Sequence, residues 1–264
     1  PTPWTLASAF NRPAATGGSS NHTQHAPKEA RLVTGRPHVY SPLGSKGLYA
    51  VRKTDGSIAW NRTETSFNAT PAYDPTTQSV IAGGADGNVY KINADTGTVL
   101  ATYNAGSPIN KSILLHGGFA FAVTDSGQLH KITISSMSGV WIYSANSAAH
   151  TPASYSPSRD ALVFATADLN VHAINNSNGQ TKWKVKPTPN TPGFPNEFNY
   201  GWPVIAEKHG IVLIRMQLDH NALLQHAPGF NYTHPDQNVN RAWLDANPQY
   251  QNLFALNLED GSKK

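Results

Sequence analysis

The sequence predicts an all-β protein, a β-propeller of four-stranded antiparallel blades, and three observations support this fold class. A hairpin pattern of apolar strand, tight polar turn and second strand occurs five times along the chain. Aromatic or histidine residues at one place in this pattern, Tyr49, Tyr90, His130 and His172, are 41, 40 and 42 residues apart. The composition, with 21 Gly, 19 Pro and 14% charged residues, indicates many turns. Four strands in about 40 residues make one propeller blade.

The second half of each repeat is the hairpin itself. The five hairpins read GLYAVRKTDGSIAW, NVYKINADTGTVLATY, QLHKITISSMSGVWIY, NVHAINNSNGQTKW and NLFALNLEDGSKK. Apolar residues stand on both faces of the first strand, as in Leu48 to Val51, which indicates a sheet that is covered on both sides. We expect a glycine in each turn to supply the positive φ that tight hairpins need. The turn pairs are Asp55-Gly56, Thr96-Gly97, Ser138-Gly139, Asn178-Gly179 and Asp260-Gly261.

The first half of each repeat is an upstream pair of strands that follows a proline. The pair is clearest after Pro71, Pro152 and Pro203, where an apolar run follows the turn. Only one such pair lies between His172 and Phe254, although these residues are 82 positions apart. We therefore expect one blade with an insertion over 217–251 there, and not a hidden sixth repeat.

At these positions the chain resembles the pyrroloquinoline-quinone (PQQ)-like, or tryptophan-docking, β-propellers, which are related to quinoprotein alcohol dehydrogenases. The repeat of that family has Ala, then Asp or Asn, then Thr-Gly, and a Trp four residues after the Gly. The fourth repeat matches best, with Ala173, Asn175, Gly179 and Trp183, whereas the third has Tyr143 four residues after Gly139. The resemblance implies that a bulky residue after each turn docks on the neighbouring blade. It assigns this structural role to Trp60, Tyr103, Tyr143 and Trp183.

The predicted organisation is an extended N-terminal arm over 1–30, followed by propeller blades over 31–264. The blades are expected at about 31–60, 71–103, 112–143, 152–183 and 203–264. The resemblance implies a propeller of about six to eight blades, of which five are visible. We therefore expect the chain to continue after Lys264 with an aromatic residue and further repeats, since sheet edges would otherwise stay open.

The enzymes of this family define the main alternative function, a PQQ- and calcium-dependent oxidoreductase or a degenerate relative of one. The resemblance would imply PQQ on the central axis, a calcium ion held by carboxylate and amide groups, and a catalytic Asp. No residue set in this sequence maps onto those ligands. Nor can a chain without cysteine form the adjacent-cysteine disulfide of many such enzymes. No catalytic residue, cofactor or metal is predicted, and PQQ and calcium belong only to the alternative.

The insertion over 217–251 departs most from the repeat pattern, and long insertions in repeat proteins are commonly functional or disordered. Its His and aromatic residues could bind a partner, and their irregular spacing favours a capping loop over a metal site. Residues 240–244 are expected to form a short helix before Pro248. The candidate binding residues are His220, His226, Phe230, Tyr232, His234 and Trp243.

Six N-x-S/T sequons make glycosylation in a secretory route possible. Their asparagines are Asn21, Asn61, Asn68, Asn110, Asn175 and Asn231. With these sequons and the family resemblance, we expect a secreted, extracellular or periplasmic protein.

The propeller architecture favours a non-catalytic scaffold or protein-binding module in an assembly. Its stacked blades form a rigid disc whose loops vary freely, and these loops would bind other protein chains or glycans. A carbohydrate-binding propeller is the second alternative, because aromatic residues of the insertion could stack on sugars. No nucleic-acid partner is expected, since the 20 Lys and Arg are scattered among 16 Asp and Glu and phosphate binding needs clustered cations. No apolar stretch is long enough for a transmembrane helix.

Overall fold

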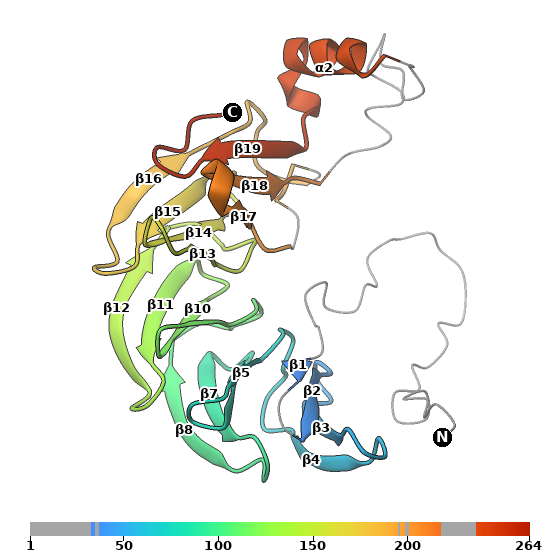
Figure 1. The fold of residues 1–264 in the computed structure, drawn as a ribbon, viewed down its shortest axis with the longest axis vertical. Helices are drawn as coiled ribbons and strands as arrows, with labels where there is room; N and C mark the ends of the chain where they lie inside the picture. Colours follow the sequence, from blue (N-terminus) through green and yellow to red (C-terminus); the bar gives the residue numbers. More distant parts are fainter. Residues whose placement is uncertain (1–32, 35–36, 195, 199–200, 218–235) are drawn as a thin grey trace. The chain divides into compact units, whose positions relative to one another are not determined.

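A computed structural model of the chain describes residues 33–34, 37–194, 196–198, 201–217 and 236–264, which form five antiparallel β-sheets (Figure 1). The predicted arm over 1–30 lies outside the described residues. We call the sheets blades one to five in chain order. Blade one contains β1 (Val33–Thr34), β2 (His38–Pro42), β3 (Leu48–Arg52) and β4 (Ile58–Arg62). Blade two contains β5 (Ala72–Asp74), β6 (Ser79–Gly83), β7 (Asn88–Asn93) and β8 (Val99–Asn104).

Blades three and four repeat this order, and blade five contains three strands. Blade three contains β9 (Leu114–His116), β10 (Phe119–Val123), β11 (Gln128–Thr133) and β12 (Ser138–Ser144). Blade four contains β13 (Ser154–Ser156), β14 (Ala161–Ala165), β15 (Val171–Asn175) and β16 (Thr181–Val185). Blade five has three strands, β17 (Val204–Ala206), β18 (Ile211–Arg215) and β19 (Leu253–Asn257).

In every blade, strands that follow one another in the sequence are neighbours in the sheet. Within each of the two compact units described below, first strands of successive blades also lie next to one another: β1 with β5, β5 with β9, and β13 with β17. This is the arrangement of propeller blades, whose first strands line the centre. The predicted all-β class of four-stranded antiparallel blades is confirmed.

The chain divides into two compact units, Pro1–Ala120 with Ile132–Gly139, and Phe121–Lys131 with Val140–Lys264. In the first unit the core lies between blades one and two, where Tyr40, Leu48 and Ile92 are fully buried. In the second it lies between blades four and five, around Val163 and Leu256. All five residues of β6 and all five of β14 are buried, as expected for strands with sheets on both faces.

Four of the five hairpin glycines adopt the left-handed conformation that we predicted. Their φ angles are 75° at Gly56, 75° at Gly97, 74° at Gly179 and 75° at Gly261. The prediction for Gly139 was wrong, because this residue lies inside β12 and Met137 takes the left-handed place with φ 51°. The Met137 N–H donates to the Thr133 carbonyl at 2.8 Å, as Gly97 donates to Asn93 at 2.9 Å. The turn therefore lies two residues earlier than expected.

Short helices occur only around blade five within the described ranges. The 3₁₀ helix η2 (Glu207–His209) joins β17 to β18. Helix α2 (Gln237–Ala246) lies in the predicted insertion, and η3 (Pro248–Tyr250) follows it. The helix expected over 240–244 is longer at both ends. It begins earlier because the Asp236 carboxylate accepts the Asn238 N–H at 2.9 Å and caps the helix. None of the described helices has the length and apolar character that crossing a membrane requires.

Candidate interaction site

Three tryptophans connect neighbouring blades in the same way. Trp60, Trp141 and Trp183 each lie on the last strand of a blade and reach the hairpin of the next one. Each indole Nε1–H donates to a backbone carbonyl there, at 2.9 to 3.0 Å. The acceptors are the carbonyls of Ala94, Asn176 and Leu258. The bonds satisfy both the indole and a hairpin carbonyl, so each tryptophan ties one blade to the next.

The indole rings also lie against the left-handed glycines of these hairpins. A Cβ atom on Gly97 would approach the Trp60 ring to 2.7 Å, and one on Gly179 would approach the Trp141 ring to 2.8 Å. At Gly261 the corresponding distance to the Trp183 ring is 2.8 Å. Glycine is therefore required here by the close approach of the ring as well as by the turn.

In the third repeat, Trp141 takes the docking position to which the sequence assigned Tyr143. The assignment counted four residues from Gly139, whereas the left-handed residue is Met137, and Trp141 is four residues after it. The Tyr143 hydroxyl instead lies 2.9 Å from Nδ1 of His172 in blade four. Its ring packs edge-on against Phe164, with centroids 6.1 Å apart.

His172 is the centre of a buried polar group. Its side chain is fully buried, its Nε2 lies 3.0 Å from the Thr166 hydroxyl, and its ring stacks on Phe164 at 5.2 Å. Burial lowers the pKa of His172 to about 4, with a smaller contribution in the same direction from the Lys184 charge. The neutral imidazole can donate from one nitrogen and accept with the other, and it links Tyr143 to Thr166.

Blade two replaces the docking tryptophan with a lysine from the adjacent strand. Ala101 stands where blades one, three and four have Trp, and it pairs across the sheet with Lys91. The buried Lys91 ammonium donates at 3.1 Å to the Ile134 carbonyl, which has the same place in its hairpin as the Ala94 carbonyl. Lys91 therefore makes the contact that an indole makes elsewhere. Tyr103, the predicted docking residue, lies against Gly139, where a Cβ would be 2.9 Å from its hydroxyl.

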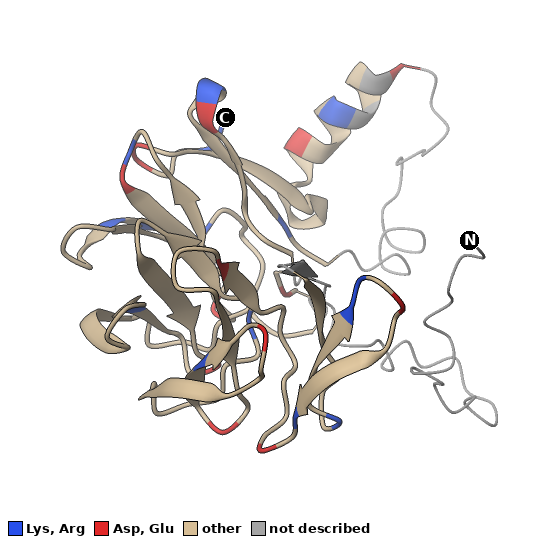
Figure 2. Ribbon diagram, turned by 60° about the horizontal axis from the view of Figure 1, so that its bottom comes forward, with Lys and Arg blue, Asp and Glu red and all other residues tan. Residues whose placement is uncertain are grey.

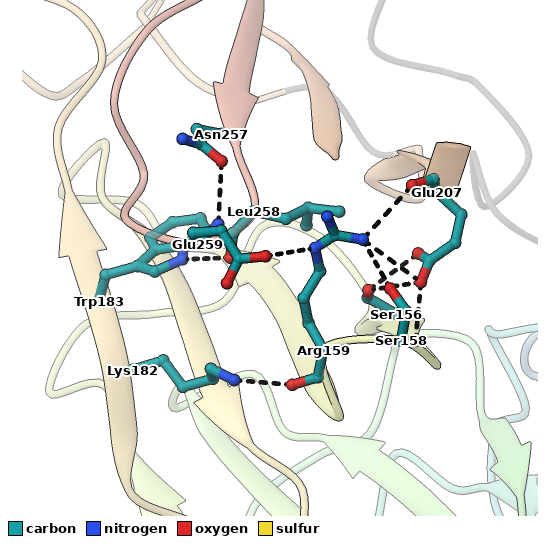
Figure 3. Close-up of polar contacts among 9 residues, drawn as sticks. All are labelled: Ser156, Ser158, Arg159, Lys182, Trp183, Glu207, Asn257, Leu258 and Glu259. Atoms are coloured by element: carbon teal, nitrogen blue, oxygen red, sulfur yellow. Dashed lines mark hydrogen bonds and ion pairs between the residues drawn. The ribbon is translucent and has the colours of Figure 1, made fainter. Parts of the chain in front are cut away.

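Arg159, in the turn between β13 and β14, holds blade five to blade four (Figure 3). Its Nε donates to Glu259 Oε1 at 2.8 Å, and its Nη1 lies 3.7 Å from Glu207 Oε1. The Glu207 carboxylate also accepts the Ser158 N–H at 2.8 Å and the Ser156 hydroxyl at 2.8 Å. Burial pushes the pKa of Glu207 upward, but the bonds from Ser158 and Ser156 and the Arg159 charge outweigh it and lower the pKa. Both acidic residues of this junction are thus positioned by one guanidinium.

Blade five carries an open groove of about 400 Å³ between α2 and the sheet. Its sheet side is apolar, with Leu213, Leu253 and Ala255, and Leu253 is 59% exposed. Its helix side contains Arg241, Leu244 and Asp245, and its end contains Lys263 and Lys264. Three cations thus face one carboxylate around an apolar floor.

The helix beside this groove is fixed at its C-terminal end. The rings of Trp243 and Tyr250 are in contact, with centroids 5.4 Å apart. The Asn247 side-chain amide donates to the Trp243 carbonyl at 2.8 Å, and the Gln251 amide donates to the Leu244 carbonyl at 3.2 Å. Among the candidate binding residues, the structure thus places Trp243 on α2. The others, His220, His226, Phe230, Tyr232 and His234, lie outside the described residues.

The sequon asparagines occupy different environments. Asn61 is exposed on β4. The Asn68 side-chain amide donates to Asn110 Oδ1 at 2.7 Å, so these two asparagines bond to one another. Asn175 Oδ1 accepts both the N–H and the hydroxyl of Ser177, at 2.9 and 2.7 Å. Asn21 and Asn231 lie outside the described residues.

Metal-binding clusters bear on the quinoprotein alternative, which would need a calcium ion. Among the described residues, no three His, Asp or Glu side chains converge closely enough to hold a metal ion. Positively and negatively charged residues are interspersed along the described ribbon (Figure 2).

Comparisons with known structures agree with the propeller architecture. The crystal structure of BamB from Moraxella catarrhalis matches 72% of this chain and 69% of its own, with a TM-score of 0.55 and 15% identity. The crystal structure of the computationally designed Ika8 protein matches 70% of this chain and 54% of its own, with a TM-score of 0.58 and 15% identity. A search among curated proteins found no match.

A sequence model of one protein family matches residues 44–193, which is more than half of the chain. The model is described as outer membrane protein assembly factor BamB. The matched region contains the hairpins whose Ala, Asn, Gly and Trp residues indicated a PQQ-like repeat, and that recognition is confirmed. The chain belongs to the BamB family of PQQ-like β-propellers.

Proposed function

We propose that this chain is a non-catalytic scaffold that binds another protein in an extracytoplasmic assembly. The observation that carries the proposal is helix α2, which is inserted in blade five and exposed along most of its length. The name of the matching family, an outer membrane protein assembly factor, supports both a protein partner and a location outside the cytoplasm.

The geometry of α2 suits protein recognition. The Asp236 cap and the contacts at Trp243 and Asn247 fix the helix before a partner arrives, which lowers the entropic cost of binding. Val239 is 45% exposed on α2, and Leu253 is exposed in the adjacent groove. Exposed apolar residues bordered by charges are typical of protein interfaces. The excess of cations at the groove favours a partner segment with apolar and acidic side chains.

Site-specific photocrosslinking tests the proposal. A photoreactive amino acid at Val239, introduced into the whole protein in its native cells, should give a crosslink to one other protein. The same amino acid at Ile58, which is 49% exposed on β4, is the matched control and should not capture that protein. Trp243→Ala should reduce the Val239 crosslink at least about tenfold, because Trp243 positions the helix. Crosslinks only within the chain, or equal capture from both positions, would contradict the proposal.

Cell fractionation of the same samples tests the location. We expect the crosslinked complex outside the cytoplasm. Dye-linked alcohol oxidation after addition of PQQ and calcium to the purified protein would instead favour the oxidoreductase.

A further inference from the structure

The last strands of blades three and four differ at two matching positions. Trp141 and Trp183 make the same docking contact, so the residues on either side of them correspond. In β16 these neighbours are the exposed Lys182 and Lys184. In β12 they are Val140 and Ile142, which are 49% and 55% exposed. Lysine on an edge strand commonly prevents pairing with another chain, and β12 has no such protection.

The β12 strand has the other properties of a pairing edge. It is the outermost strand of its sheet, so one of its edges has no strand partner among the described elements. At seven residues it is the longest described strand, and its sequence SGVWIYS contains no charge and no proline. Such a strand presents a row of backbone donors and acceptors to a second strand.

The strand is also complementary to itself. In an antiparallel pair with Trp141 opposite Trp141 of the partner subunit, Val140 stands opposite Ile142 of the partner subunit, and the reverse pair is identical. Cross-strand pairs of β-branched residues are favourable, and no like charges meet. We propose that two copies of this chain associate through antiparallel pairing of β12 with β12. This inference does not depend on the α2 site.

Analytical ultracentrifugation tests the pairing. The whole chain should dimerise reversibly at concentrations up to about 0.1 mM. Val140→Lys with Ile142→Lys copies the lysines of blade four, and it should raise the dimer dissociation constant at least about tenfold. The matched control is Leu100→Lys on β8, where Leu100 is 49% exposed, and it should leave the dissociation constant unchanged. Circular dichroism should show the same fold in all variants.

Disulfide trapping tests the register without adding charge. The chain has no cysteine, so Ser138→Cys with Ser144→Cys introduces the only thiols. With Trp141 at the centre, residue 138 faces residue 144 of the second copy, and mild oxidation should give a covalent dimer. Either single variant should give at least about tenfold less covalent dimer, because the thiols of its two copies are then far apart across the strand pair. A monomeric wild-type chain, a dimer that survives the two lysines, or one that Leu100→Lys alone removes would overturn the proposal.

Discussion

Individual tryptophans hold neighbouring blades together by packing and by one hydrogen bond each. Trp183 is 7% exposed, packs in the core of blades four and five, and donates to the Leu258 carbonyl. Trp183→Ala should lower the free energy of unfolding by about 3 to 5 kcal/mol in urea denaturation. Trp183→Phe keeps a ring but leaves the carbonyl unpaired, and a loss of about 1 to 3 kcal/mol is expected. Unchanged stability in the alanine variant would refute the docking role.

The buried His172 gives the stability of the fold a predicted pH dependence. Burial lowers the pKa of His172 to about 4 in the folded chain, while the unfolded side chain titrates near its ordinary value of 6.5. The unfolded chain therefore binds more protons between those values, so stability falls as the pH drops from about 6.5 to 4 and is unaffected above. The loss from this one group is about 2 to 3 kcal/mol at pH 4.5.

The variant His172→Phe isolates this effect, because Phe254 has the same place in the fifth repeat. The variant should be less stable than the wild type at pH 7.5, since Tyr143 and Thr166 lose their common partner. Between pH 7.5 and 4.5, its free energy of unfolding in urea denaturation should nevertheless decrease by about 2 to 3 kcal/mol less than that of the wild type. His116→Phe, which removes an exposed histidine, is the matched control. If the free energy of unfolding depends on pH equally in the wild type and both variants, His172 is excluded as the titrating group.

Paired strands allow one residue to replace the contact of another, as blade two shows. Lys91 and Ala101 face each other across β7 and β8, where Ala50 faces Trp60 in blade one. Lys91→Ala should lower stability by about 1 to 3 kcal/mol, because the Ile134 carbonyl loses its donor. Lys91→Ala with Ala101→Trp recreates the pair of blade one and should recover most of that loss in thermal and urea unfolding. If the double variant is less stable than Lys91→Ala alone, the two arrangements are not equivalent.

The sequence was sufficient to predict elements wherever local chemistry decides them. Alternating strands and turn glycines located four of the five hairpins, because a positive φ favours glycine. The third hairpin was misplaced because Met137 accepts that conformation, while Gly139 two residues later is equally suitable by residue type. The replacement of Trp by Ala101 beside a lysine was a usable signal for the Lys91 contact. The sequence offered no signal for the contact of Arg159, because its partner Glu259 is 100 positions away along the chain.

At the scale of the whole molecule, each docking contact described above joins consecutive blades. The stability of a blade should therefore depend on the adjacent blades and not on distant ones. In repeat architectures each unit contacts mainly those before and after it. Trp60 acts on the hairpin of blade two, and Trp183 acts on the hairpin of blade five. The core between blades one and two shares no residue with the core between blades four and five.

Hydrogen exchange can measure this locality segment by segment. Trp60→Ala should increase amide exchange in β3, β4 and β7 while the amides of β15, β18 and β19 keep their protection, because its cavity and lost bond lie between blades one and two. Trp183→Ala should give the opposite pattern. The two free-energy losses should then add within about 0.5 kcal/mol in the double variant, since the two tryptophans pack in cores that share no residue. If either substitution speeds exchange equally in all blades, the sheets unfold as one cooperative body and the docking bonds act on the entire chain.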